Sequence, residues 1–310
     1  GSHTAKALAR AGYEPVVFDN LSTGHRWAVK WGSLVEADLA DKAAIGKALN
    51  DHAIDAVIHF AACAYVGESM QDPGKYFQNN VAGSLNLLEA MQATGVKKIV
   101  FSSSCATYGM PESLPISEDH PTSPVNPYGE SKLMVEKMLR WYGEIHDFKW
   151  ISLRYFNAAG ADPAGEIGEV HDPETHLIPI AIAAALDESR HLAVFGTDYP
   201  TPDGSAVRDY IHVADLASAH LLAFESMDRI NNQAFNLGTG NGVSVHEIIK
   251  QVSGLSERVI KPVFEKRRPG DPPILVADPG KAQRVLGWKP LYTDVSDCLK
   301  TAMAWMKNRR

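Results

Sequence analysis

Residues 101–132 read FSSSCATYGMPESLPISEDHPTSPVNPYGESK and carry the pattern from which the fold can be inferred. The segment Lys97-Lys98-Ile99-Val100-Phe101 predicts a strand, which the run Ser102-Ser103-Ser104 closes. A helical pattern follows at 126–145. A strand, a polar loop and a helix in this order form the repeating unit of a parallel sheet covered by helices.

The helical pattern opens with residues that are typical of a helix start. Asn126 is the candidate N-cap, and Pro127 stands in the first turn, where its missing N–H costs nothing. Positions i and i+4 of a helix share a face, so Tyr128 and Lys132 would point the same way. A nearby ammonium and a cationic ring favour the phenolate, so Tyr128 could take a proton from an alcohol. The same spacing also occurs by chance, and an amphipathic surface helix is the alternative interpretation.

Strand and helix patterns alternate through the first half of the chain. Predicted strands lie at 14–19, 56–61, 97–101 and 150–155, and predicted helices at 4–11, 41–51, 73–93 and 126–145. This alternation predicts an α/β fold with a doubly wound parallel sheet of the Rossmann type. From Asn157 onward Pro, Gly and short elements become more frequent, with helices predicted at 180–187, 213–225 and 245–253 and a strand at 234–237. We expect a second, smaller α/β substrate domain over the carboxyl edge of the sheet.

Composition excludes several classes of function. The 310 residues are 45% hydrophobic and 22% charged, which is ordinary for a globular enzyme, and the net charge of −7 argues against non-specific binding of nucleic acid. The three cysteines, Cys63, Cys105 and Cys298, show no metal-ligand spacing and are expected to be reduced thiols. No apolar run approaches about 18 residues. We therefore expect a soluble, cytoplasmic protein without a metal or a membrane partner.

Acidic residues at strand ends suggest a dinucleotide cofactor. Asp19 ends the strand after the first helix, where a carboxylate hydrogen-bonds a ribose 2′-hydroxyl and repels a 2′-phosphate, which favours NAD over NADP. A solvated aspartate that caps the turn before Asn20 is the alternative. Asp38-Leu39 and Phe60-Ala61-Ala62 also fall at strand ends on the same edge, and this favours the cofactor interpretation.

The chain begins at Gly1-Ser2-His3-Thr4, directly before a predicted helix. Dinucleotide binding in this fold uses a first strand and a glycine-rich turn that deliver the pyrophosphate to a helix N-terminus. We expect Gly1 to be the last glycine of that turn, with the first strand and most of the turn absent, which would weaken NAD binding and folding. Gly-Ser-His is also a common remnant of an expression tag.

We divide the chain into two predicted domains. The NAD-binding domain takes residues 1–157, with 210–237 returning to it. The substrate-binding domain takes residues 158–209 and 238–310.

Taken in order, these residues form a family likeness that covers nearly the whole chain. The matching motifs are Gly1-Ser2-His3-Thr4, Asp19-Asn20-Leu21-Ser22, His59-Phe60-Ala61-Ala62, Val66-Gly67-Glu68-Ser69, Asn79-Asn80-Val81, Phe101-Ser102-Ser103-Ser104, Asn126-Pro127-Tyr128-Gly129 with Lys132, Arg154-Tyr155-Phe156-Asn157, Val207-Arg208-Asp209-Tyr210, and Arg267-Arg268 with Gly270-Asp271. The chain resembles the extended short-chain dehydrogenase/reductase family and, within it, the UDP-glucose (UDP-galactose) 4-epimerases.

The resemblance implies an NAD-dependent isomerase that oxidises a UDP-sugar at C4 and returns the hydride to the opposite face, so that UDP-glucose and UDP-galactose interconvert. Tyr128 would be the base and acid at the 4-hydroxyl, Lys132 would bind the nicotinamide ribose and lower the tyrosine pKa, and Ser104 would hydrogen-bond the 4-oxygen. The residues expected to bind the cofactor are Gly1, Asp19, Asn20, Asp38, Leu39, Phe60, Ala61, Ala62, Asn79, Ser102, Tyr128, Lys132 and Tyr155.

The resemblance also implies that residues in the second half of the chain bind the nucleotide. Arg208 and Arg268 would bind the diphosphate, since a guanidinium makes forked contacts with phosphate. The other expected contacts are Asp271 to the uridine ribose, Asn157 to a diphosphate or sugar oxygen, and Ala193 and Phe195 along the uracil. His176 and Leu177 are also expected to contact the substrate; they lie in Thr175-His176-Leu177-Ile178-Pro179, where related proteins often have paired asparagines before a Leu-x-Pro segment. An Arg208–Asp209 ion pair, a solvated Arg267-Arg268 loop and a packed surface histidine are the alternatives. Leu275 takes the position that gates sugar size, and it leaves the preferred sugar open.

The rival reactions of the family need other residues. Nucleotide-sugar dehydratases carry acidic residues just after the position of Ser104, and the decarboxylases that form UDP-xylose place a glutamate there. Here those positions hold Cys105 and Ala106, which favours epimerisation. A UDP-pentose 4-epimerase and a non-catalytic protein that binds NAD or nucleotide sugars remain as alternatives. The resemblance also implies a homodimer built from the helices at 73–93 and 126–145.

Overall fold

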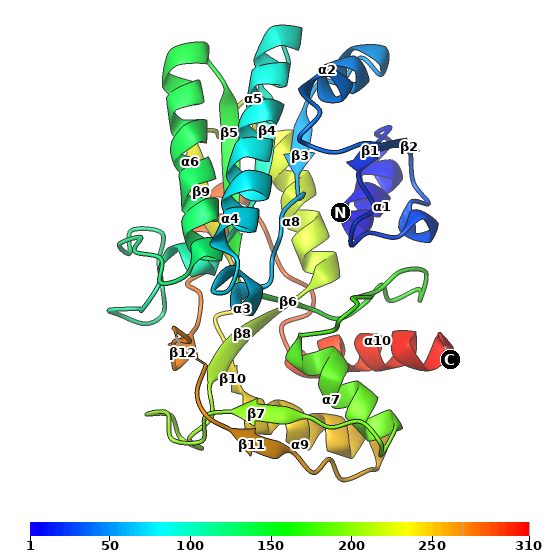
Figure 1. Cartoon of the computed structure of the whole chain (residues 1–310), viewed down its shortest axis with the longest axis vertical. Coiled ribbons are helices and arrows are strands. Elements are labelled where there is room, and N and C mark those ends of the chain that lie inside the picture. The colour runs from blue at the N-terminus through cyan, green and yellow to red at the C-terminus, as the bar shows by residue number, and fades with distance from the viewer. Residues whose placement is uncertain (269, 310) are drawn as a thin grey trace.

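The centre of the molecule is strand β4 (Lys98–Ser104), seen here in a computed structural model that describes residues 1–268 and 270–309 (Figure 1). It pairs in parallel with β3 (Val57–His59) on one side and β5 (Lys149–Tyr155) on the other, and β9 (Gln233–Leu237) follows β5. The strand is longer than predicted, because the run Ser102-Ser103-Ser104 continues the ladder as far as Tyr155 instead of closing it. The carboxyl end of β4 thus carries buried hydroxyl groups.

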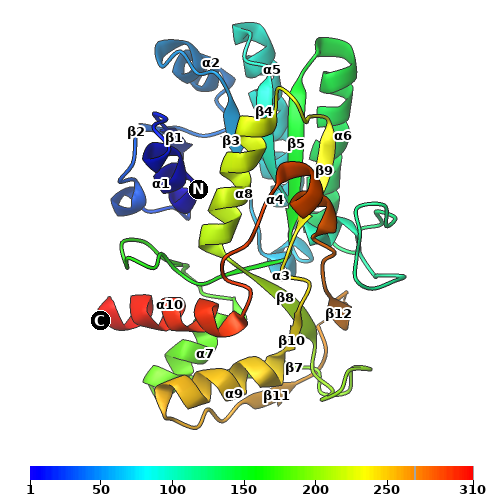
Figure 2. The same ribbon diagram turned by 180° about the vertical axis from the view of Figure 1, so that it is seen from behind.

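Helices cover both faces of this four-stranded sheet. Helices α2 (Lys42–Asp51), α5 (Gly83–Thr94) and α6 (Pro127–His146) lie on one face and α8 (Val213–Ser226) on the other (Figures 1 and 2). The period of two along β4 explains both cores: Ile99 and Phe101 pack under α5 and α6, and Val100 packs under α8. The predicted doubly wound α/β arrangement is confirmed.

The parallel strands of the first half fall into two sheets. β1 (Val16–Asp19) and β2 (Ser33–Glu36) form a separate parallel pair beside the sheet of β4. Helix α1 (Ser2–Arg10), which precedes them, packs against α8.

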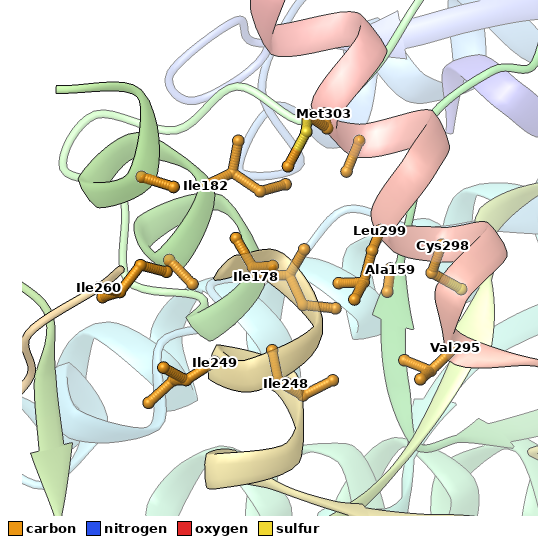
Figure 3. Close-up of a cluster of buried hydrophobic side chains, with 14 of the residues drawn as sticks. Ala159, Ile178, Ile182, Ile248, Ile249, Ile260, Val295, Cys298, Leu299 and Met303 are labelled. Carbon is orange, nitrogen blue, oxygen red and sulfur yellow. The ribbon is translucent and has the colours of Figure 1, made fainter. Parts of the chain in front are cut away.

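The second half builds its own apolar core. Side chains from α7 (Leu177–Leu186), α9 (Val245–Ser256) and α10 (Val295–Asn308) meet there, and Figure 3 shows Ile182, Ile248 and Leu299 pointing toward one another. Two small sheets flank this core. One contains β6 (Asn157–Ala159), β8 (Val207–His212), β10 (Gly242–Ser244) and β12 (Ile274–Leu275), and the other pairs β7 (Ala193–Phe195) with β11 (Val263–Glu265).

The helix predicted at 73–93 is interrupted. It begins as α4 (Pro73–Tyr76), passes through a π-helical segment (Phe77–Ala82) and continues as α5. Such wide turns are frequent at functional sites, and this one turns Asn80 into the interior. The remaining short elements are α3 (Val66–Ser69), the 3₁₀ turns Arg26–Ala28 and Cys105–Thr107, and a second π-helical segment at Ala282–Leu286.

No helix in the two described ranges combines the length and the apolar content needed to cross a lipid bilayer.

We predict that Leu139→Ala lowers the free energy of unfolding by about 2–5 kcal/mol, because it opens a cavity between α6 and the sheet. Leu139 is fully buried in that core. Urea unfolding followed by circular dichroism measures the loss. Leu291→Ala removes the same atoms from a side chain that is 82% exposed and should change stability by less than about 0.5 kcal/mol. Equal losses in the two variants would contradict the assigned core.

Candidate active site

The start of α6 lies against the turn that follows β4. Asn126 caps the helix by accepting a hydrogen bond from Gly129 N at 2.8 Å, as predicted. A Cβ added to Gly129 would lie 2.4 Å from the carbonyl oxygen of Ala106, so only glycine permits this approach. The contact brings Tyr128, on the first turn of α6, beside Ser104, on the last residue of β4.

Tyr128 and Lys132 do share one side of α6. The Lys132 ammonium lies 5.9 Å from the centre of the Tyr128 ring and 4.9 Å from that of Phe101, and it donates a hydrogen bond to the carbonyl oxygen of Ser102 at 2.8 Å. Lys132 is buried, and this burial lowers its pKa to about 8. At neutral pH the lysine therefore remains mostly charged.

Burial also sets the direction in which the pKa of Tyr128 shifts. It raises the pKa of Tyr128 above the usual value, with the nearby Tyr155 acting in the same direction and hydrogen bonding with Ser104 opposing both. This direction is opposite to the lowered pKa that we predicted. The predicted lowering relied on an ammonium and a cationic ring near the phenol, whereas the Lys132 ammonium points at the backbone of Ser102.

A buried polar network that we did not predict lies beneath these residues. Glu136, one turn after Lys132 on α6, accepts hydrogen bonds from Ser103 Oγ at 2.6 Å and from Arg154 Nε at 2.9 Å. Arg154 also donates to the hydroxyl of Tyr108 at 3.0 Å. The signal was present in the sequence, because a glutamate four residues after Lys132 must lie on the same face of the helix.

Residues predicted to bind the cofactor line the carboxyl ends of β4 and β5. The hydroxyl groups of Ser102 and Tyr155 lie 2.6 Å apart, and both side chains are held by the register of the two strands. Phe60 follows β3 and packs on His220 of α8, with ring centres 4.6 Å apart. Ala61 and Ala62 continue the same loop.

At the end of β1 the predicted carboxylates are held by local hydrogen bonds. Asp19 accepts from Leu21 N at 2.8 Å, and Asn20 donates to Asp38 at 2.6 Å. A Cβ on Gly24 would lie 3.1 Å from an Asp19 oxygen, so this glycine leaves space beside the carboxylate. Leu39 follows Asp38 and packs against Gly83 at the start of α5.

Gly1 and Asn79 are two further residues that were predicted to bind the cofactor. Gly1 precedes α1 as its N-cap residue. Asn79 donates to Asn80 at 2.9 Å, and Asn80 in turn joins Cys63 to Ser131 of α6. The buried member of the asparagine pair is Asn80, which the prediction did not include among the cofactor residues.

These residues fit a bound NAD. A partly exposed carboxylate at the end of a strand suits ribose hydroxyls, and the lysine and tyrosine beside the end of β4 suit a second ribose and a reacting centre. The carboxyl edge of a parallel sheet is also where ligands bind in such folds.

Arg208 and Arg268, which are predicted to bind the diphosphate, both have side-chain partners in the structure. Arg208 on β8 is buried and forms an ion pair with Asp271, and the guanidinium of Arg268 lies 3.9 Å from the centre of the Phe195 ring. Asp209, the alternative partner of Arg208, instead accepts hydrogen bonds from Thr239 and Gly240.

Other predicted positions lie on neighbouring elements. Asn157 begins β6 and pairs with Tyr210, Ala193 begins β7, and Leu177 begins α7. Leu275 is buried on β12 beside Arg208.

His176 has an unpredicted set of partners. Its Nδ1 meets Glu169, whose hydrogen bond raises the pKa of His176 against the effect of burial. His171 lies between Glu169 and Glu174, which together raise its pKa to about 10. The signal in the sequence is the close spacing of two glutamates and two histidines between residues 169 and 176.

The two residues after Ser104 supply no acid or base. Cys105 is buried in a small apolar cluster that raises the pKa of its thiol to about 12, and Ala106 uses its backbone N–H to bind Ser104 Oγ at 3.1 Å. Neither side chain can exchange a proton with a substrate at neutral pH.

A doubly wound sheet with a tyrosine, a lysine and a serine at the carboxyl end of its central strand defines a dinucleotide-dependent enzyme of the short-chain dehydrogenase/reductase type. A model of the NAD dependent epimerase/dehydratase family matches residues 1–238, and the chain belongs to that family.

Full-length relatives agree with this assignment. The chain is 49% identical over 306 residues to the UDP-glucose 4-epimerase of Rhizobium leguminosarum bv. trifolii, covering 98% of this chain and 93% of the relative. It is 48% identical over 310 residues to that of Rhizobium meliloti (strain 1021), covering 100% and 94%. The crystal structure of UDP-glucose 4-epimerase from Brucella ovis in complex with NAD has a TM-score of 0.94 and 51% identity, covering 98% of this chain and 94% of that one.

We predict that Glu136→Gln destabilises the protein by about 3–5 kcal/mol, because it leaves the buried Arg154 charge without its partner. Both side chains of this pair are at most 10% exposed. Denaturant unfolding measures the loss. The matched control is Asp51→Asn, which breaks an exposed ion pair with Lys47 on α2 and should cost less than about 1 kcal/mol. A loss of that small size at Glu136 would show that the buried pair contributes little.

Proposed function

We infer that the chain is an NAD-dependent UDP-glucose 4-epimerase, an isomerase that interconverts UDP-glucose and UDP-galactose. The observation that carries this inference is the placement of Tyr128 beside Ser104, above the charged Lys132, in a chain that matches UDP-glucose 4-epimerases over nearly its whole length. The neutral Cys105 and Ala106 agree with it, since dehydration and decarboxylation need further acid–base groups. Neither a UDP-pentose 4-epimerase nor a non-catalytic binding protein is favoured.

The side chains at the end of β4 divide the proton chemistry between them. The Tyr128 oxygen, as the phenolate, takes the proton of the sugar 4-hydroxyl, and the Ser104 hydroxyl holds the 4-oxygen while that proton moves. NAD, when bound, would supply the hydride-transfer chemistry that the epimerisation at C4 requires. Tyr128 then gives the proton back to the 4-oxygen, so the reaction leaves the cofactor and Tyr128 unchanged.

The charge on Lys132 has a defined task in this scheme. Its buried ammonium binds a ribose hydroxyl of the cofactor and lies on the same side of α6 as the phenol, where a positive charge favours the phenolate. Burial by itself raises the pKa of Tyr128 and so disfavours the phenolate. The proton transfer therefore depends on positive charge beside the phenol, which Lys132 supplies and to which an oxidised nicotinamide ring would add.

The second half of the chain would hold the nucleotide while the keto sugar turns. We propose that Arg208 and Arg268 bind the diphosphate, that Asp271 binds the uridine ribose, and that Asn157 binds a diphosphate or sugar oxygen. The Arg208–Asp271 ion pair and the Arg268–Phe195 contact support this grip, because they orient both guanidinium groups in advance.

The remaining expected contacts belong to the same grip. Ala193 and Phe195 would line the uracil, and Leu177 and His176, through its Nε2, would face the substrate. We accordingly propose that residues 1–157 and 210–237 bind NAD and that 158–209 and 238–310 bind the UDP-sugar.

We also propose a homodimer that works in the cytoplasm. Large apolar side chains are exposed on the two long helices: Leu85 on α5, and Trp141 and Ile145 one turn apart on α6. Exposed apolar surface of this kind marks interfaces between chains. The free thiols of Cys63, Cys105 and Cys298 suit a reducing compartment.

Tyr128→Phe is expected to lower turnover of UDP-galactose about 10²–10⁴-fold with little change in UDP-sugar affinity, because it removes only the hydroxyl that moves the proton. The product is read by NMR after incubation with NAD, and affinity is measured by calorimetry. Tyr13→Phe is the control, since Tyr13 is exposed and far from β4 in the sequence. Near-normal turnover in Tyr128→Phe would remove this residue from the mechanism, and a wild-type protein that forms no UDP-glucose would refute the proposed function.

Ile145→Glu is expected to convert the dimer to a monomer, because it places a charge in an apolar interface. Light scattering at micromolar concentration gives the molar mass. Val259→Glu, at a position that is 84% exposed outside α5 and α6, should leave the dimer intact. A wild-type monomer, or a dimer that survives in Ile145→Glu, would count against this interface.

A further inference from the structure

The loop that leads into α7 gathers two carboxylates and two imidazoles. Glu169, His171, Glu174 and His176 each place one ligand atom within 4.8 Å of all the others. The sequence separates these residues by only two or three positions, and the loop folds them around one point. The epimerase reaction proposed above does not involve the side chains of Glu169, His171 or Glu174.

Two of the separations between the ligand atoms lie close to those around a four-coordinate ion. His171 Nδ1 lies 3.2 Å from Glu169 Oε1 and 3.4 Å from Glu174 Oε1, and His176 Nδ1 lies 3.9 Å from Glu174 Oε1. His176 Nδ1 is closer still to Glu169 Oε1. A tetrahedral site with bonds of about 2.0–2.2 Å places its ligands roughly 3.3–3.6 Å apart. Small shifts of the half-exposed His176 side chain would complete that geometry.

We propose that Glu169, His171, Glu174 and His176 form a structural site for a divalent cation of the Zn²⁺ type. Imidazole nitrogen and carboxylate oxygen are ligands that Zn²⁺ accepts, and four protein ligands without an open position are typical of structural sites. The two carboxylates neutralise the ion. Each imidazole must coordinate without a proton on Nδ1, so binding releases one proton from each histidine that was charged.

The surroundings support a built site. Glu174 Oε1 also accepts hydrogen bonds from the backbone N–H groups of Thr175 and His176, at 2.8 and 2.9 Å, which orient this carboxylate. Trp305 of α10 donates to the carbonyl oxygen of Glu169 at 3.2 Å, and the ring of Tyr65 packs edge-on against His171. Contacts outside the ligand shell hold metal ligands in place in this way.

The position of the site gives the ion a structural task. His176 is the N-cap residue of α7, the helix that contributes to the core of the second half, and Tyr65 comes from the segment after β3. A bound ion would therefore fix the start of α7 to the preceding loop and to the neighbourhood of α3. His176 Nε2 stays free, so the site is compatible with substrate contact there and does not depend on the proposed reaction.

The test uses the full chain with its bound NAD, treated with a chelator and then dialysed against Co²⁺ or Zn²⁺. We expect one equivalent of metal per chain and, with Co²⁺, the intense visible absorption of a four-coordinate ion. His171→Gln should weaken binding about 100-fold or more, since loss of an outer contact alone costs about 10–100-fold. Glu174→Gln, which keeps an oxygen for the backbone N–H groups, tests the same ligand set with less risk to folding.

The control is His52→Gln, which removes an exposed histidine at the end of α2 and should bind metal like the wild type. Circular dichroism confirms that each variant is folded. The proposal is overturned if the wild type retains no metal after dialysis, which would identify the cluster as two carboxylate–imidazolium ion pairs. It is also overturned if His171→Gln and Glu174→Gln both bind as tightly as the control.

Discussion

The contact between the start of α6 and the turn after β4 is the constraint on which the site depends. Gly129 meets the carbonyl oxygen of Ala106 so closely that no side chain fits, and the contact fixes how far the first turn of α6 stands from the end of the strand. Tyr128 and Ser104 face each other as a result. Because the helix start is capped by Asn126 and the strand end is locked by the β5 register, neither partner can shift alone.

Burying Tyr128 and Ser104 also places charged side chains in the interior, and the fold brings these charged side chains next to one another. Lys132 lies in the first half of α6, Glu136 one turn later, and Arg154 on β5 beneath them. Glu136 balances Arg154 and acts on Lys132, keeping the pKa of the lysine higher than burial alone would allow. An isolated buried ammonium would lose its proton, so the charge that the mechanism needs is maintained by residues that never meet the substrate.

In the second half of the chain, the residues proposed to bind the nucleotide are held by contacts with neighbouring side chains. Arg208 and Asp271 already pair with each other, and Arg268 already lies on Phe195, so a nucleotide meets guanidinium groups with limited freedom. Pre-orientation of this kind reduces the entropy lost on binding. It suits an epimerase, in which the nucleotide must stay bound while the oxidised sugar turns. The carboxylate–imidazole cluster before α7 would stiffen the same half at the start of that helix.

Local patterns in the sequence determined much of this protein. The apolar period of the strands and helices predicted the doubly wound sheet, the cap at Asn126 predicted the start of α6, and the spacing of Tyr128 and Lys132 predicted their common face. Tertiary structure alone decided that β1 and β2 lie apart from the main sheet, that β4 runs through its serines, that Glu136 pairs with Arg154, and that four polar residues before α7 converge. Helix period and capping are properties of neighbouring residues, whereas pKa values and ion pairs depend on what other segments bring close in space and on how much water they exclude.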